Sequence, residues 1–232
     1  MPTAPLPRPL SCAAAPYPEV CEPLEEVTAA QPADAATTLG FCLARLAAVC
    51  AKDRRPAVLV TTGDWLRERG RPFGHGFKAW GVSPERLIWI RAERETEALW
   101  ALEEALKSGA VAGAVGSVEA ASFVATRRLD FAARAGAALG LILRARGAAD
   151  LSAARRRWRI GALSSGENAF DPLAPGPVRL RAELVRRRDG PPAAWDLERD
   201  DETGGLRLVA GLAGHGVATR PTTVPGAIER AA

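Results

Sequence analysis

The loop before the first apolar helical pattern is the part of the chain whose spacing comes nearest to a chemical motif. A phosphate-binding loop at this place would read G-x-x-x-x-G-K-[ST], because glycines let several backbone amides point at one phosphate and the lysine neutralises charge. Ala30 and Ala35 stand at the two glycine positions, Ala36 stands at the lysine position, and Thr37 keeps the final hydroxyl. Alanine disfavours the backbone angles that such a loop needs, and Asp34 adds a repelling charge. The sequence therefore predicts a degenerate phosphate loop that does not hold ATP tightly.

Glu93 is the one carboxylate placed to act as a general base, because it directly follows a predicted strand. Two flanking arginines are more typical of a solvated ion pair than of a catalytic site. Gly116 and Ser117 stand where a magnesium-holding carboxylate would be expected, and His75 lies in a glycine-rich loop without a predicted partner. We therefore expect no metal and no cofactor, and catalysis by Glu93 only if the chain is a divergent ATPase.

Arginines gather between residues 141 and 200, where twelve of them face eight acidic residues, a surplus equal to the whole net charge of +4. Arginine with an interleaved aromatic ring can hold phosphates and stack on bases. Two interpretations stay open, a solvated surface or contact with single-stranded DNA. The candidate DNA-binding residues form two runs: Arg155, Arg156, Arg157, Trp158 and Arg159, then Arg186, Arg187 and Arg188.

The composition is that of a globular protein with one domain of ordinary to large size. The chain has 232 residues, 47% hydrophobic and 25% charged, and its mean hydropathy is -0.05. No apolar run approaches the ~18 residues of a membrane span, so we expect no membrane protein. The start lacks the apolar core of a secretion signal, and the four cysteines lack C-x-x-C spacing. Reduced thiols in the cytoplasm fit best.

Hydrophobic periodicity predicts strands that alternate with helices, which requires parallel strands joined by crossover helices. The loop at 67–81 is expected to hold no more than one helical turn. We expect the strand at 87–90 to be buried, and Phe123, Leu129 or Phe131, and Ala135 to face inward on the last helix. Predicted strands are 57–62, 87–90, 111–115 and 139–143, and predicted helices are 37–50, 95–108 and 119–135.

After Gly147 the pattern changes to period-two strands with turn-like links, which predicts antiparallel pairing. We expect a flexible Pro/Ala-rich tail at 1–22, one domain at 23–210 and a loose tail at 211–232. Within the domain, a parallel core reaches to about 147 and an antiparallel extension covers 155–210. The fold class is an α/β, open, mostly parallel sheet flanked by helices, with C-terminal antiparallel strands.

The order of these parts resembles a RecA-like core that has lost its ATPase parts. The resemblance includes a short strand near 24–27, followed by the degenerate loop and by Thr37 at the start of the first helix. Glu93 stands in a segment similar to the one that carries the RecA catalytic glutamate, and 139–144 resembles the strand that leads into the RecA DNA-binding loop. Within that superfamily, related also to SulA, the chain from about 24 to 208 resembles the ImuA family. The motifs that carry this resemblance are Arg71-Pro-Phe-Gly-His-Gly-Phe77, Trp100-Ala-Leu-Glu-Glu-Ala-Leu106, Ser108-Gly-Ala-Val111, Arg127-Arg-Leu129, Ala153-Ala-Arg-Arg-Arg-Trp-Arg159, Asp171-Pro-Leu-Ala-Pro-Gly-Pro177, Glu183-Leu-Val-Arg186 and Trp195-Asp-Leu-Glu198.

The resemblance implies a RecA-like accessory protein of SOS-induced, error-prone translesion DNA synthesis. The partners that it implies are an ImuB-like relative of Y-family polymerases and a DnaE-type polymerase. RecA, single-stranded DNA and a second copy of the chain are further candidates. Two alternatives remain, a SulA-like inhibitor of cell division and a divergent RecA-type DNA-dependent ATPase that uses Glu93.

Overall fold

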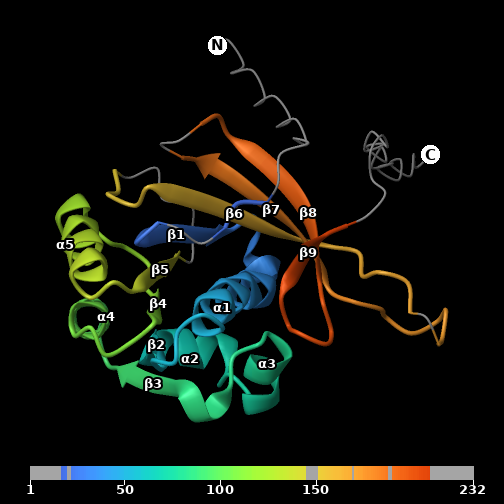
Figure 1. Ribbon diagram of the computed structural model, residues 1–232, viewed down its shortest axis with the longest axis horizontal. Coiled ribbons are helices and arrows are strands. Elements are labelled where there is room, and N and C mark those ends of the chain that lie inside the picture. Colours follow the sequence, from blue (N-terminus) through green and yellow to red (C-terminus); the bar gives the residue numbers. More distant parts are fainter. Residues whose placement is uncertain (1–16, 20–21, 145–150, 169, 188–189, 210–232) are drawn as a thin grey trace, which may run out of the picture.

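The computed structural model describes residues 17–19, 22–144, 151–168, 170–187 and 190–209, and one nine-stranded sheet runs through them (Figure 1). The strand order is β3-β2-β4-β5-β1-β6-β7-β8-β9. The strands are β1 (Leu24–Ala29), β2 (Ala57–Thr62), β3 (Leu87–Ala92), β4 (Gly113–Ser117), β5 (Leu139–Arg144), β6 (Arg156–Leu163), β7 (Arg179–Arg186), β8 (Ala193–Arg199) and β9 (Leu206–Leu208).

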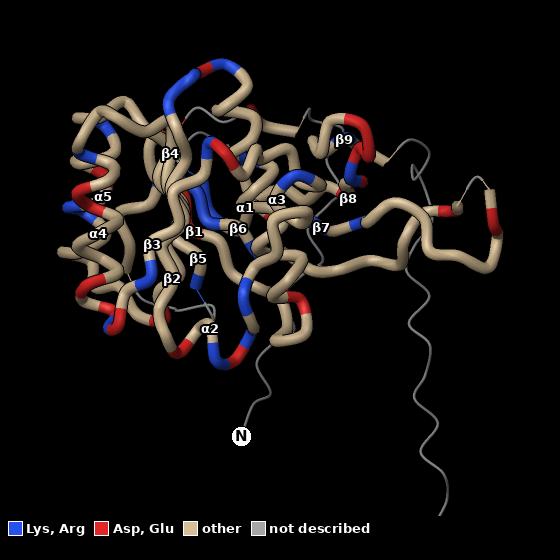
Figure 2. Tube along the Cα trace, turned by 90° about the horizontal axis from the view of Figure 1, so that it is seen from below, with Lys and Arg blue, Asp and Glu red and all other residues tan. Residues whose placement is uncertain are grey.

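Helices cover both faces of the parallel half of this sheet (Figures 1 and 2). Successive strand residues point to opposite faces, so Leu59 joins the core layer around α1 while Val58 joins the layer under α4 and α5. The helices are α1 (Ala35–Cys50), α2 (Gly63–Arg69), α3 (Gly74–Ala79), α4 (Glu95–Lys107) and α5 (Phe123–Ala135), with 3-10 turns at Pro32–Asp34 and Pro84–Arg86.

The predicted fold class is confirmed. Five strand pairings are parallel, β1 with β5 and β6, β2 with β3 and β4, and β4 with β5. The pairings β6–β7, β7–β8 and β8–β9 are antiparallel. Strand β6 joins the two halves, because it runs parallel to β1 on one side and antiparallel to β7 on the other. The inner faces of β6, β7 and β8 share one core cluster with α1, so the antiparallel strands close over that helix.

Three local predictions were wrong. The 67–81 region contains the last three residues of α2 and all of α3. Thr62 caps α2 by accepting a hydrogen bond from the amide of Trp65, and Gly70 ends it with a positive φ. Strand β3 is an edge strand, and Ile88 is 48% exposed. On α5 Leu129 faces inward, as one of the two alternatives expected, but Phe123 and Ala135 are exposed.

Two predictions about the chain as a whole also need correction. Pro32–Cys50 spans 19 residues with a hydropathy of 1.4, which is long and apolar enough for a membrane span. Its composition is explained by burial, because α1 lies between the sheet and the strands that close over it. Tyr17 does not belong to a loose tail, since its ring packs 6.0 Å from Trp158. The remaining predicted tail residues, apart from 17–19 and 22, lie outside the described residues.

Candidate functional site at the carboxyl ends of the parallel strands

The turn between β1 and α1, where the degenerate phosphate loop was predicted, is closed by the carboxylate of Asp34. Asp34 is 8% exposed, and its Oδ2 accepts a hydrogen bond of 3.0 Å from the amide of Gln31. Its Oδ1 accepts one of 3.1 Å from the amide of Ala162 on β6, and its carbonyl accepts one from the Thr38 hydroxyl. A negative charge of the protein itself therefore stands beside the end of α1 that would attract a phosphate.

The backbone of this turn is not shaped as an anion cradle. A phosphate-binding nest needs successive amides in alternating right- and left-handed conformations. Among the described residues, Ala137 is the only non-glycine residue with a positive φ, so Ala30, Ala35 and Ala36 all have ordinary backbones. Residues 32–34 form a 3-10 turn that leads straight into the helix containing Thr37. The turn therefore lacks the alternating backbone conformations of a phosphate-binding nest, and the loss of tight triphosphate binding stays a prediction.

Glu93 lies far from this turn. It follows β3 at the edge of the sheet, it is exposed, and its amide donates a hydrogen bond to Glu97. Four strand spacings separate β3 from β1, which corresponds to about 19 Å at roughly 4.8 Å each. A general base must come within about 3 Å of the proton that it removes. Glu93 therefore cannot serve a nucleotide seated at the start of α1.

A hollow of about 400 Å³ does open between the ends of β2 and β4, and acidic residues line it. Its lining comprises Thr62, Asp64, Trp65, Glu68, Arg69, Glu95, Ser117 and Glu119. Glu95 accepts hydrogen bonds from the amides of Glu119 and Ala120, and Asp64 pairs with Arg67. Among the described residues no three carboxylate, cysteine or histidine side chains are grouped to hold a metal ion. The acidic lining of the hollow repels an anion, and its described residues offer no metal site that could offset this repulsion.

The first arginine run does not form a surface, because the alternation of β6 sends Arg156 and Trp158 into the core. Trp158 is 0% exposed, and its indole Nε1 donates a hydrogen bond of 2.9 Å to Glu25 Oε2. Arg45 donates one of 2.6 Å to Oε1 of the same carboxylate, and Arg156 lies 3.6 Å from it. A buried indole cannot stack on a base, so the predicted DNA-binding role does not fit Trp158 or Arg156.

A second buried ion cluster occupies the opposite face of β1. Glu26 lies 3.5 Å from Arg144 on β5 and 3.7 Å from Arg157 on β6. Arg144 also donates a hydrogen bond of 2.5 Å to the carbonyl of Ala121. The neighbouring acids Glu25 and Glu26 thus each hold arginines from other elements, one on each face of the sheet. Arg157, a candidate DNA-binding residue, is largely buried here.

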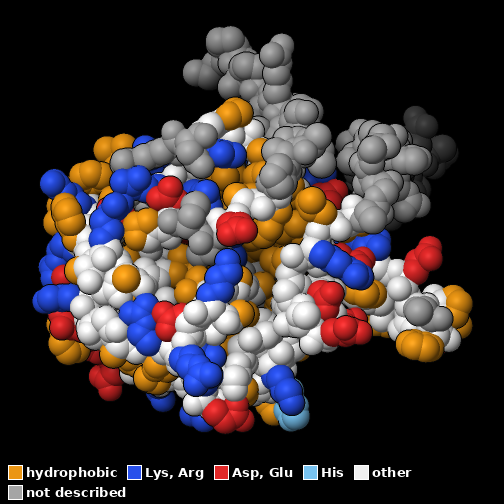
Figure 3. Space-filling view, viewed as in Figure 1, with side chains coloured by type: hydrophobic (Ala, Val, Ile, Leu, Met, Phe, Trp, Pro, Cys, Tyr) orange, Lys and Arg blue, Asp and Glu red, His pale blue; other side chains and the backbone are white. Residues whose placement is uncertain are grey.

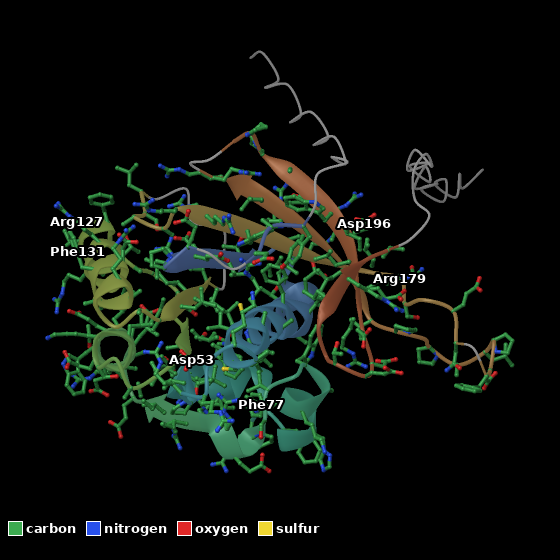
Figure 4. The ribbon with its side chains drawn as sticks, viewed as in Figure 1. Asp53, Phe77, Arg127, Phe131, Arg179 and Asp196 are labelled. Atoms are coloured by element: carbon green, nitrogen blue, oxygen red, sulfur yellow. The ribbon has the colours of Figure 1, made fainter. Side chains whose placement is uncertain are left out.

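The exposed face of the antiparallel strands carries a ladder of ion pairs, which we call the salt-bridge ladder. Figure 4 labels two of its residues, Arg179 and Asp196. Its pairs are Arg159–Glu183, Arg181–Asp196 and Arg179–Glu198, and in each pair the two residues are direct partners across adjacent strands. Arg207 of β9 extends the ladder to Glu198. Each arginine of the ladder already has a carboxylate, so a phosphate would have to displace it.

The other candidates are scattered. Arg155 lies 3.6 Å from Glu22, and Arg186 is exposed at the end of β7, opposite Arg157. Arg187 is partly buried, and Arg188 lies outside the described residues. The two runs meet where Arg186 and Arg157 are partners across β6 and β7. The ladder acids were the signal that sequence reasoning missed, because each stands at a strand position facing an arginine.

Comparison with known proteins decides the family. No protein-family model matches the chain. Over 208 residues the chain is 36% identical to Protein ImuA of Caulobacter vibrioides (strain NA1000 / CB15N), covering 84% of this chain and 80% of that protein. Protein ImuA of strain ATCC 19089 / CIP 103742 / CB 15 gives the same figures. The chain belongs to the ImuA family.

The resemblance to the ImuA family predicted from the sequence is thereby confirmed. Among solved structures, SulA from Pseudomonas aeruginosa aligns with a TM-score of 0.40 and 24% identity, over 53% of this chain and 98% of that one. The surface of this ImuA-family chain carries exposed apolar side chains on α5, β3 and the β6–β7 connection.

Proposed function

We propose that this ImuA-family chain is a cytoplasmic, non-catalytic adaptor in damage-induced, error-prone translesion DNA synthesis. The observation that carries the proposal is the Asp34 carboxylate, which is bonded to Gln31 and Ala162 beside the start of α1. With that charge in place, the RecA-like core serves as a scaffold for other proteins. The family relationship supports a role in damage-induced DNA synthesis, and the geometry of the turn before α1 supports a protein that does not hydrolyse ATP.

The partners that we propose are the ImuB-like relative of Y-family polymerases and the DnaE-type polymerase. An adaptor needs exposed surface that a partner can cover, and large exposed apolar side chains mark such surface. Phe123, Val124 and Phe131 are exposed on α5, and Ile88 and Trp89 are exposed on β3. These elements lie away from the salt-bridge ladder (Figure 1), so the ImuB-like protein and the DnaE-type polymerase can bind to separate surfaces.

Direct contact with single-stranded DNA is the weaker part of the proposal. Arg155, Arg159, Arg186 and Arg187 remain as candidates, and the first two are paired with carboxylates. Phosphate binding by such residues would release counterions, so affinity for an oligonucleotide should fall steeply with salt. Absence of binding at low salt would remove DNA from the list of partners and leave the adaptor role intact.

The test is reconstitution from purified full-length proteins. The chain is mixed with the ImuB-like protein and the DnaE-type polymerase of the same genome, pairwise and together, and complexes are separated by size-exclusion chromatography. We expect a ternary complex that the two polymerases do not form without the adaptor, and that forms equally well with and without ATP and magnesium. Failure to bind either polymerase, or a strict requirement for ATP, would refute the proposal.

A further inference from the structure

The connection between β6 and β7 projects from the end of the sheet as an arm, defined here as residues 164–168 and 170–178 (Figures 1 and 2). Its far end presents two large apolar side chains to solvent. Phe170 is 98% exposed and Leu173 is 96% exposed, the highest values among the exposed large hydrophobic residues of the described chain. Figure 3 shows hydrophobic side chains gathered at the tip of this projection. Side chains of this kind are the usual anchors of protein interfaces.

The tip is held together by its own hydrogen bonds. Oδ1 of Asn168 accepts hydrogen bonds from the amides of Phe170 and Asp171, at 2.9 and 3.2 Å. Nδ2 of Asn168 donates one of 3.3 Å to the carbonyl of Pro175, and the carboxylate of Asp171 accepts one of 2.9 Å from the amide of Leu173. Two apolar side chains thus point outward from a backbone that is already ordered, which lowers the entropic cost of docking.

The stem of the arm is equally constrained. The amide of Gly166 donates a hydrogen bond of 2.9 Å to the carbonyl of Pro177, and the amide of Gly176 donates one of 3.2 Å to the carbonyl of Gly166. A Cβ atom at Gly176 would overlap the backbone of Gly166 and Glu167. Glycine is therefore required where the two segments of the stem approach each other, and the close contact between them fixes the direction in which the arm leaves the domain.

Charge indicates what kind of surface receives the tip. The described residues of the arm include Glu167 and Asp171 and no lysine or arginine, although the whole chain has a net charge of +4. A complementary surface is an apolar pocket with a basic rim. The chain's own hollow, about 690 Å³ along α1, does not fit this description. Of its lining cations, Lys52 is paired with Glu19 and Arg45 with Glu25, and Glu19 and Asp53 would repel the acids of the arm.

We infer that the arm is the docking element for a protein partner, inserting Phe170 and Leu173 into an apolar pocket with a basic rim on the ImuB-like protein. This inference rests on the proposed function, and it assigns the contact to an element that plays no part in the core. Because both side chains are almost fully exposed, their removal leaves the fold unchanged while it removes both anchors.

The experiment measures binding of the full-length chain to the purified ImuB-like protein by isothermal titration calorimetry. Three variants are compared with the wild type: Phe170→Ala/Leu173→Ala, Asn168→Ala, and the control Trp100→Ala, which removes exposed apolar surface from α4. We expect about a 100-fold loss of affinity for the arm variant, because each anchor is of the size that contributes a factor of roughly ten or more. The Asn168 variant should lose about tenfold, since it keeps the anchors and loosens the tip. The control should bind like the wild type.

The outcomes separate the two proposals. If the wild type binds and the arm variant binds within about twofold of it, the arm inference is wrong and the adaptor proposal stands. Equal losses in the arm variant and the α4 control would also overturn the inference, because they would indicate a general dependence on apolar surface. If the wild type alone, in sedimentation velocity, is an oligomer that the arm variant reduces to a monomer, the occupant is a second copy and the inference fails. If the wild type does not bind at all, the proposed partnership itself fails.

Discussion

Glu25→Ala should destabilise the protein severely, because Glu25 is the centre of the buried cluster that joins β1, α1 and β6. The change leaves Arg45 buried without its carboxylate, which costs about 3–5 kcal/mol, and leaves the indole N–H of Trp158 without an acceptor, which adds about 1–3 kcal/mol. The matched control is Glu183→Ala, which breaks the exposed pair with Arg159 and should cost about 0–1 kcal/mol.

The assay is urea denaturation followed by tryptophan fluorescence, which reports unfolding through the exposure of the buried Trp158 and Trp195, two of the six tryptophans. A total of this size is comparable with the whole stability of a domain, so Glu25→Gln takes the place of Glu25→Ala where that variant does not fold. The amide keeps one acceptor and removes the charge, and we expect a loss of about 1–3 kcal/mol that still exceeds the control. A free energy of unfolding within about 1 kcal/mol of Glu183→Ala would refute the structural role given to this cluster, and with it the reassignment of Arg156 and Trp158.

Three further predictions follow from single contacts. Hydrogen bonds from Arg207 of β9 and Arg179 of β7 lower the pKa of Glu198. Its contribution to stability is therefore present above the ordinary glutamate pKa of about 4.3 and is lost as the pH falls through the lower folded value. Between pH 6 and pH 3 the urea midpoint should fall less in Glu198→Gln than in the wild type, and identical slopes would contradict this. Gly40→Ala should cost about 1–3 kcal/mol, because its Cβ would overlap the Trp80 ring, and an unchanged melting temperature would show that the ring moves freely. Burial raises the pKa of the Cys42 thiol, so iodoacetamide at pH 8 should label it only after urea is added, and mass spectrometry showing rapid labelling of the folded protein would contradict its buried position.

Most of the parallel half could be predicted from the sequence, because buried strands such as β2 and β5 are continuous apolar runs bounded by turn residues. The degenerate loop could also be predicted, since the missing glycines and lysine are visible in the sequence. Strand β3 has the same apolar character, yet it is an edge strand, because strand order depends on pairing between distant segments and not on local composition.

The basic runs were the part that sequence reasoning misplaced. Four arginines around Trp158 suggested an exposed surface, but the alternation of Trp158 and Ile160 with Arg157 and Arg159 is a strand pattern that directs the apolar side chains inward. The buried indole N–H of Trp158 donates its hydrogen bond to Glu25, which lies 133 residues earlier in the chain. Contacts over that separation exist only once β1 and β6 are neighbours in the sheet, so no local pattern could have revealed them.

We place the Asp34 carboxylate, in the turn before α1, at the position where an ATPase of this type would bind a phosphate of the nucleotide. Isothermal titration calorimetry of ATP with magnesium into the full-length protein tests this placement most directly. We predict no saturable binding up to about 1 mM nucleotide, which corresponds to less than roughly 4 kcal/mol of binding free energy. Saturable binding with a Kd of about 10 μM or tighter, weakened by Thr37→Val, would contradict the claim.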